Sequence, residues 1–173
     1  MNELIAKIEQ WANDRNIIKG SKPIDQAMKL FSEFGELADN VGKGRDCLDD
    51  IGDCAVVLIV ISKQLGETVA SIDVGEINWK YGNKSLVSEL CGQLYEFVSS
   101  AKSDIWDYGS LSFSLEFLNK IAIDCGSTLE ECLQIAYDDI KNRKGIMSNG
   151  VFIKESDPAY ESIIKAIEEN CGE

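Results

Sequence analysis

The chain contains no histidine and only two prolines among its 173 residues. Without histidine, Ser-His-Asp and Cys-His catalysis are excluded, and so is zinc held by imidazole ligands. The scarcity of proline favours long helices, because proline breaks the interior of a helix. No stretch is rich in glycine and serine or low in complexity, so we expect residues 1–173 to form a single domain without a flexible linker.

The sequence also lacks a CxxC pair, the commonest redox and metal-binding arrangement of cysteine. The six cysteines are Cys47, Cys54, Cys91, Cys125, Cys132 and Cys171. A chain of this size, with 45% hydrophobic residues, can build a core without disulfides. We therefore expect reduced and mostly buried thiols in a cytoplasmic protein. The beginning of the chain, Met1-Asn2-Glu3, has no signal-peptide pattern, which agrees with that expectation.

Positive charge is in short supply, since 17 Lys and Arg residues face 30 Asp and Glu residues and give a formal net charge of -13. Such a field repels nucleic acids and anionic membranes, so neither is expected as a partner. The longest strongly apolar run, Cys54 to Ile61, is far shorter than the ~20 residues that span a bilayer. A nucleotide remains a possible ligand where metal ions or local cations reverse the field.

Apolar residues recur at helical spacing through most of the chain, which predicts an all-α fold. The expected helices cover residues 2–16, 23–42, 46–65, 85–101, 111–122 and 127–145, with a short last helix from residue 158. Ser127 and Glu130 have the form of a capping box, and Asn149-Gly150 that of a turn. The β-branched run from Cys54 to Ile61 is also compatible with a buried strand, but its flanks and the lack of other convincing strands favour a helix.

A weak internal similarity suggests that the chain consists of two diverged helical halves, about residues 1–84 and 85–173. Residues 30–34 resemble residues 86–90, and residues 77–82 resemble residues 140–145. In this interpretation the first half is catalytic and the second is a pseudo-repeat with a C-terminal tail. The alternative is a coincidence among similar amphipathic helices.

Two pairs of carboxylates form the strongest chemical pattern. Glu33 and Glu36 are three residues apart on one expected helix, and Asp50 and Asp53 repeat this spacing at the start of the next. Residues three apart are neighbours on a helix surface, so two adjacent antiparallel helices would direct both pairs at one point. Gln26, Lys29 and Asn40 continue the stripe of Glu33 and Glu36 at spacings of three and four.

Electrostatics indicates what such a point must contain. Two like charges ~4 Å apart repel by about 4 kcal/mol at an effective dielectric near 20, so four carboxylates need cations or protons. Oxygen ligands without histidine or cysteine favour Mg2+, with Mn2+ as a substitute, over zinc. The alternative is structural: the glutamates would form a solvated helix face, and the aspartates would favour the helix N-terminus through its dipole.

Residues ~20–66 and ~127–157 resemble the all-α nucleoside triphosphate pyrophosphohydrolases of the MazG-like superfamily. The resemblance lies in Glu33-x-x-Glu36, then thirteen residues, then Asp50-x-x-Asp53 followed by an apolar helix. The lead-in from Gln26 and the later segments 136–145 and 149–154 also resemble the family. The chain departs from the family at Asp50, where glutamate is usual.

This resemblance implies a four-helix-bundle core with additional C-terminal helices, and a homo-oligomer, either a dimer or a tetramer. It implies Mg2+-dependent hydrolysis of a nucleoside triphosphate to the monophosphate and pyrophosphate, with Glu33, Glu36, Asp50 and Asp53 as metal-binding and catalytic residues. Two alternatives stay open. One is a dUTP- or dCTP-specific pyrophosphatase of the same superfamily, and the other is a catalytically inactive helical regulatory or assembly module.

The remaining candidate residues concern the substrate. Lys141, Arg143 and Lys144 are candidate phosphate ligands in an acidic chain, or else cations that favour a helix C-terminus. Lys29 shares the carboxylate stripe and is a fourth phosphate candidate, or a simple partner of Glu33. Trp11 and Gln26 are candidates for base binding, although Trp11 also has the spacing of a core residue.

Overall fold

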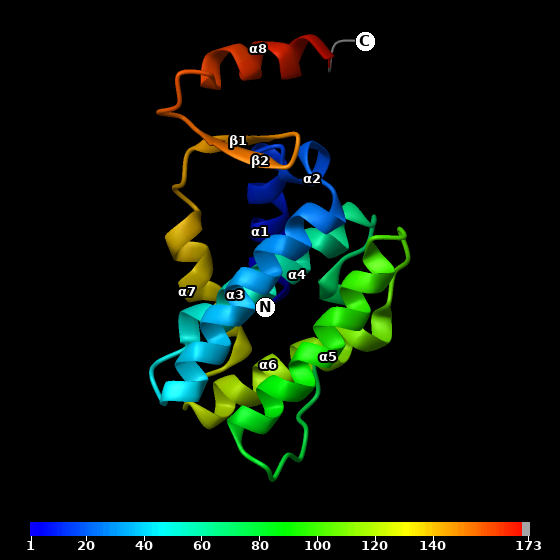
Figure 1. Cartoon of the computed structure of the whole chain (residues 1–173), viewed down its shortest axis with the longest axis vertical. Coiled ribbons are helices and arrows are strands. Elements are labelled where there is room, and N and C mark those ends of the chain that lie inside the picture. Colours follow the sequence, from blue (N-terminus) through cyan, green and yellow to red (C-terminus); the bar gives the residue numbers. More distant parts are fainter. Residues whose placement is uncertain (171–173) are drawn as a thin grey trace.

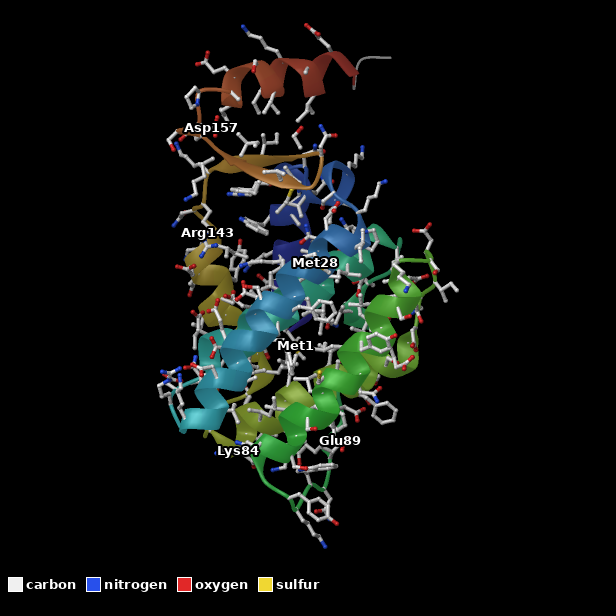
Figure 2. The ribbon with its side chains drawn as sticks, in the orientation of Figure 1. Met1, Met28, Lys84, Glu89, Arg143 and Asp157 are labelled. Atoms are coloured by element: carbon white, nitrogen blue, oxygen red, sulfur yellow. The ribbon has the colours of Figure 1, made fainter. Side chains whose placement is uncertain are left out.

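The computed structural model describes residues 1–170 and is mostly helical (Figure 1); Figure 2 adds the side chains in the same orientation. Its helices are α1 (Asn2–Asp14), α2 (Ile17–Gly20), α3 (Pro23–Lys43), α4 (Leu48–Gln64), α5 (Asn83–Ala101), α6 (Tyr108–Asp124), α7 (Leu129–Ile140) and α8 (Tyr160–Asn170). A 3-10 turn, η1 (Val69–Ser71), follows α4. Two strands, β1 (Gly145–Ser148) and β2 (Val151–Lys154), form an antiparallel hairpin. Among residues 1–170, no helix has the length and apolar character that a membrane crossing requires.

Helices α3 and α4 form a hairpin whose ends are encoded locally. Pro23 occupies the first turn of α3, where its missing N–H costs no hydrogen bond. Gly44 ends this helix in the left-handed conformation, with φ of 65°. The run from Cys54 to Ile61 is helical and every residue in it is buried, so the helix prediction is confirmed. The run is apolar on all sides because α4 is the central helix, packed by α1, α3, α6 and α7.

Helices α5 and α6 form a second hairpin, and α5 packs on α3 while α6 packs on α4 (Figure 1). Fully buried apolar side chains fill the space between the two hairpins; the largest include Leu30, Leu37, Leu58, Leu90, Phe97 and Leu111. The division of the chain into two diverged halves remains a prediction.

Helix α7 packs closely along α4 because Gly52 has no side chain. A Cβ atom at position 52 would lie 2.1 Å from the carbonyl oxygen of Cys132. The capping box of this helix lies one residue later than predicted, since it joins Thr128 and Glu131. The helix ends at Ile140, so the predicted extension to residue 145 was wrong.

The described residues form a mostly helical chain, as predicted, and the hairpin of β1 and β2 is a small addition that the prediction did not include. Asn149 and Gly150 form its turn with φ angles of 50° and 77°, as a two-residue turn that matches the twist of paired strands requires. Met147 is buried and donates its backbone N–H to the carbonyl oxygen of Arg15, which ties the hairpin to the N-terminal helices. Helix α8 lies beyond the hairpin (Figure 1) and begins at Tyr160, two residues later than predicted.

Five of the six cysteines lie within the described residues, and all five are free thiols. Cys47, Cys54 and Cys132 are buried, while Cys91 and Cys125 are exposed. Cys47 Sγ lies 3.8 Å from Cys125 Sγ, and burial, followed by this neighbour, raises the pKa of Cys47 to about 12. The burial of three of these five agrees with the expectation of mostly buried thiols, and Cys171 lies outside the described residues.

Candidate functional site

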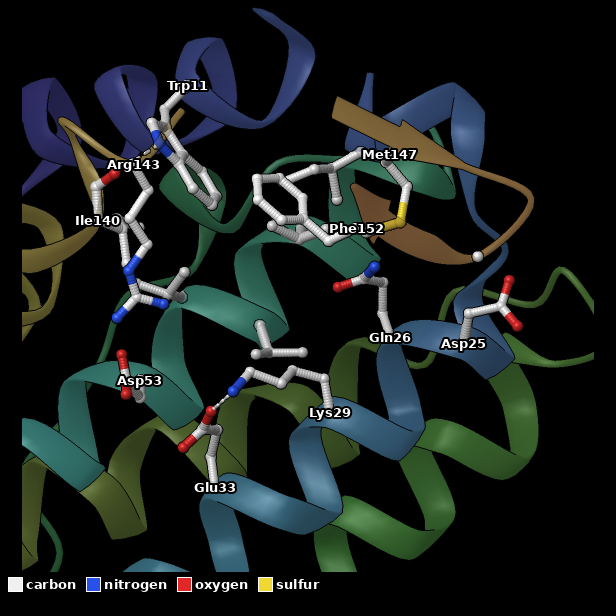
Figure 3. A pocket seen from close by; sticks show the side chains of 15 residues that line it. Trp11, Asp25, Gln26, Lys29, Glu33, Asp53, Ile140, Arg143, Met147 and Phe152 are labelled. Carbon is white, nitrogen blue, oxygen red and sulfur yellow. Dashed lines mark hydrogen bonds and ion pairs between the residues drawn. The ribbon is translucent and has the colours of Figure 1, made fainter. Parts of the chain in front are cut away.

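One pocket of about 310 Å³ collects six of the ten residues proposed from the sequence (Figure 3). It lies where α1, α3, α4, the end of α7 and the β-hairpin meet. The six are Trp11, Gln26, Lys29, Glu33, Asp53 and Arg143, and the other lining residues are Ile17, Asp25, Val56, Val57, Val60, Ile140, Met147, Gly150 and Phe152. The pocket therefore has an ionic end, formed by α3, α4 and Arg143, and an aromatic end against the hairpin (Figure 3).

At the ionic end, Glu33 is a nearly buried carboxylate with only 4% of its surface exposed. Its partner is Lys29, one helical turn earlier, and Figure 3 shows the ammonium group directed at the carboxylate. A buried charge is stable only when it is paired, which explains the ion pair. Lys29 thus forms the pair considered from the sequence, and it also faces the pocket.

Asp53 stands on α4 and has a strongly perturbed titration. Burial raises the pKa of Asp53 to about 7, and the nearby charges of Glu33 and Asp49 add to the effect. Lys29 and Arg143 oppose this shift, but they do not cancel it. The pocket lining has three carboxylates, from Asp25, Glu33 and Asp53, against two cations, and this excess of negative charge favours the binding of a cation.

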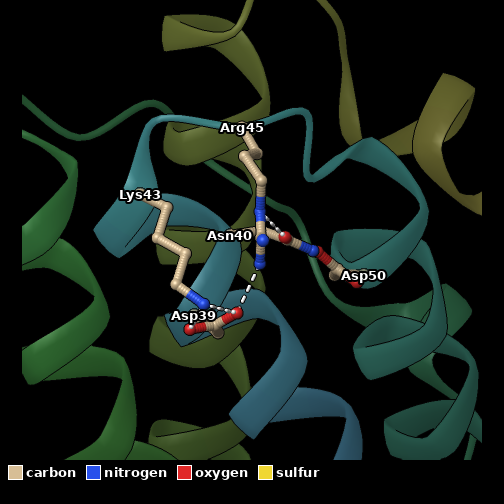
Figure 4. A network of polar contacts seen from close by, with 5 residues as sticks. All are labelled: Asp39, Asn40, Lys43, Arg45 and Asp50. Carbon is tan, nitrogen blue, oxygen red and sulfur yellow. Dashed lines mark hydrogen bonds and ion pairs between the residues drawn. The ribbon is translucent and has the colours of Figure 1, made fainter.

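The other two predicted carboxylates lie outside the pocket lining. Glu36 is exposed on α3. Asp50 accepts a hydrogen bond of 2.6 Å from Asn40 Nδ2, and Arg45 Nε donates to Asn40 Oδ1 at 2.7 Å (Figure 4). Arg45 also pairs with Asp39, so this network connects the end of α3 to the start of α4 (Figure 4).

The thiol of Cys54 shows that all four carboxylates still share one neighbourhood. Its pKa is raised well above the ordinary value, first by burial and then by the charges of Glu33, Asp53, Asp50 and Glu36. Within residues 1–170, however, no three acidic or cysteine side chains converge closely enough to hold a metal ion. The donors fit Mg2+ in kind, being carboxylate oxygens on two packed helices. In this structure, the Lys29 ammonium group supplies the positive charge next to Glu33.

The three basic residues after α7 do not form one cluster. Lys141 pairs with Asp138 at 2.6 Å, Arg143 pairs with Asp139, and Lys144 pairs with Glu155 at 3.2 Å. Only Arg143 lines the pocket, where Figure 3 places its guanidinium group opposite Asp53. The structure thus separates Arg143 from the other two phosphate candidates.

The aromatic end is built from Trp11 and from the hairpin residues Phe152 and Met147 (Figure 3). Trp11 is half-buried, and its Nε1 donates to the carbonyl oxygen of Ile140 at 2.9 Å. The guanidinium group of Arg15 lies 5.1 Å from the centre of the Trp11 ring and donates to backbone carbonyls at the end of α7. These contacts hold the indole ring in place, with part of its surface facing the pocket.

Sequence reasoning missed the hairpin residues and the polar residues that support Gln26. Val151-Phe152-Ile153 after Asn149-Gly150 is a hairpin signal that could have been recognised. Ser21 and Gln64 carried no such signal, since they come together only when α2 packs on α4. Asp25, which also lines the pocket, precedes Gln26 and was not singled out.

The comparisons with known proteins leave the family open. No protein-family model matches the chain, and no solved structure matches it. A 66-residue segment is 47% identical to an uncharacterized 18.2 kDa protein from the rep-hol intergenic region of Haemophilus phage HP1. That match covers 37% of this chain and 40% of the phage protein, so the chain is similar to this relative over less than half of its length.

Proposed function

We propose that the protein hydrolyses a (deoxy)nucleoside triphosphate to the monophosphate and pyrophosphate with Mg2+. The observation that carries this proposal is the division of one pocket into a carboxylate-rich end with two cations and an aromatic end. A nucleotide has the matching division, since its phosphates are anionic and its base is flat and apolar on both faces. The similarity of the carboxylate pattern to MazG-like enzymes supports the same reaction.

Glu33, Glu36, Asp50 and Asp53 are the residues that would hold Mg2+. When bound, the ion supplies positive charge that neutralises the phosphate oxygens and activates water as a nucleophile. Glu33 lies close enough to Asp53 for its charge to help raise the pKa of Asp53, which supports this choice of ligands. Glu36 and Asp50 reach the same centre only if they leave the positions described above.

The chain's own residues have three further tasks. Lys29 and Arg143 lie at the same end of the pocket as the carboxylates and bind phosphate oxygens, for which the planar guanidinium group of Arg143 is well suited. Val56, Val57 and Val60 exclude water from the middle of the pocket, which strengthens the ionic contacts there. Trp11 and Phe152 provide the surfaces on which the base stacks.

The test is a screen of the canonical ribo- and deoxynucleoside triphosphates with Mg2+, in which pyrophosphate and orthophosphate are measured separately. We expect the monophosphate and pyrophosphate as products, with no turnover in EDTA or in the Glu36→Gln and Asp53→Asn variants. Orthophosphate as the first product indicates attack at the γ-phosphorus and contradicts the proposal. Near-normal turnover in both variants would show that these carboxylates are not the site.

A screen that finds turnover for one pyrimidine alone would narrow the activity to a dUTP- or dCTP-specific pyrophosphatase. No turnover with any nucleotide, in folded protein with Mg2+ or Mn2+, would leave the non-catalytic helical module as the better description.

A further inference from the structure

The hydroxyl group of Ser21 fixes the orientation of a side-chain amide in the pocket. Ser21 Oγ lies 2.7 Å from the carbonyl oxygen of Ile17. A carbonyl oxygen carries no hydrogen, so the single hydroxyl hydrogen of Ser21 must lie in this contact. Ser21 Oγ therefore has only lone pairs to offer to its other neighbours.

Two amide groups use those lone pairs. Gln26 Nε2 lies 2.9 Å from Ser21 Oγ, and Gln64 Nε2 lies 3.0 Å from it. Each contact requires an N–H from the glutamine, because Ser21 has no second hydrogen to donate. The amide of Gln26 is thus fixed with its nitrogen towards Ser21 and its oxygen towards the cavity. Figure 3 shows that oxygen turned to the middle of the pocket, and the side chain is only 7% exposed.

The other polar groups at the aromatic end already have hydrogen-bond partners within the protein. Asp25 also lines the pocket, and its carboxylate accepts the backbone N–H of Lys22 at 2.8 Å. Trp11 Nε1 donates to Ile140, and the backbone N–H groups of Met147 and Gly150 donate to Arg15 and Gly20. The two cationic side chains of the pocket, Lys29 and Arg143, belong to the ionic end and pair with Glu33 and Asp139. A base in the aromatic end therefore meets an acceptor, the side-chain oxygen of Gln26.

From this arrangement we infer that the pocket selects nucleotides whose base carries an exocyclic amino group, with Gln26 Oε1 as the acceptor and Ser21 as its positioning residue. This inference rests on the proposed function, since it assumes that the ligand is a nucleotide. An amino group offers an N–H donor to Gln26 Oε1. The matching oxo base offers a carbonyl oxygen at that position, and two facing acceptors leave a buried group unpaired.

Two pairs of nucleotides isolate this difference. Cytosine and uracil differ in an amino or oxo group at position 4, and adenine and hypoxanthine differ likewise at position 6. The α,β-imido analogues of dCTP, dUTP, dATP and dITP resist hydrolysis at the α,β linkage, so calorimetry with Mg2+ measures binding without turnover. We expect each amino base to bind roughly tenfold or more tightly than its oxo counterpart.

The decisive variant is Ser21→Ala, which changes a residue outside the pocket lining. Without the hydroxyl group the Gln26 amide is free to turn over, and we expect the preference for amino bases to fall to about twofold or less. Ser114→Ala is the matched control, because Ser114 is also buried and makes the same 2.7 Å bond to a carbonyl four residues earlier, but in α6. The control should keep the wild-type preference.

A second variant covers the case in which Ser21→Ala fails to fold. Gln26→Met keeps the length of the side chain but removes its oxygen, and it should also abolish the preference. Equal binding of amino and oxo analogues by the wild type, or binding of none, overturns the inference. An unchanged preference in folded Ser21→Ala and Gln26→Met proteins does so as well. The proposed function fails separately, when the preference is present but the natural triphosphates are not hydrolysed.

Discussion

Replacing Asp53 with asparagine should stabilise the protein in the absence of metal while abolishing its activity. The substitution removes a charge that burial and Glu33 disfavour, and it keeps the size and shape of the side chain. The pKa of Asp53 rises from an ordinary value of 3.8 to about 7. Ionised Asp53 therefore destabilises the folded protein at neutral pH.

The magnitude follows from this difference in pKa. Each pKa unit corresponds to about 1.4 kcal/mol, so ionised Asp53 lowers the free energy of unfolding by at most about 4 kcal/mol. Asp53 is only partly buried and solvent screens its interactions, which reduces the expected gain to about 1–2 kcal/mol. For a chain of this length, such a gain raises Tm by roughly 2–8 °C.

The sign of the pH dependence can be stated as well. Because the pKa of Asp53 is raised in the folded protein, this residue does not reduce the free energy of unfolding below about pH 3.8. The free energy of unfolding then falls as the pH rises through about 7, where Asp53 ionises in the folded state. The advantage of Asp53→Asn should therefore be greatest above pH 8 and about half as large at pH 5.5. Thermal unfolding in EDTA at pH 5.5 and pH 8.5 measures both values.

The control is Asp73→Asn, which removes one charge from an exposed loop position and alters the net charge equally. It should change Tm little at either pH. Mg2+ should raise the Tm of the wild type and of Asp73→Asn, but much less that of Asp53→Asn. An Asp53→Asn protein that is no more stable than the wild type at pH 8.5 would refute the claim that ionised Asp53 destabilises the fold.

Two further predictions use matched pairs of variants. Arg143→Ala should raise KM by roughly tenfold, the effect of losing one charged hydrogen bond. Lys141→Ala should leave KM unchanged. Both residues pair with an aspartate, but only Arg143 lines the pocket. Equal effects in steady-state kinetics would contradict this assignment. Gly52→Ala should destabilise the fold by about 1–3 kcal/mol, because its Cβ would meet the Cys132 carbonyl. Gly35→Ala, in an open helical position, should be neutral or stabilising by up to about 1 kcal/mol in denaturant titrations.

The helices were largely predictable because their signals are local. Pro23 and Gly44 delimit α3 within one turn of each end, and the apolar periodicity between them gives its buried face. The same logic failed after Ile140, where a helical pattern continued in the sequence but the chain turns into β1. There the deciding contacts are non-local, such as the bond from Met147 to Arg15, which no window of neighbouring residues contains.

What the sequence by itself determined is the helical class of the fold and the placement of Glu33 and Asp53 on neighbouring helices, because periodicity and spacing act within a few turns. Only the tertiary structure decided which candidates share a pocket, because that depends on how distant segments pack. It brought Trp11 and Arg143 beside Glu33, left Lys141 outside, and turned the oxygen of Gln26 into the cavity through a hydroxyl group on another element.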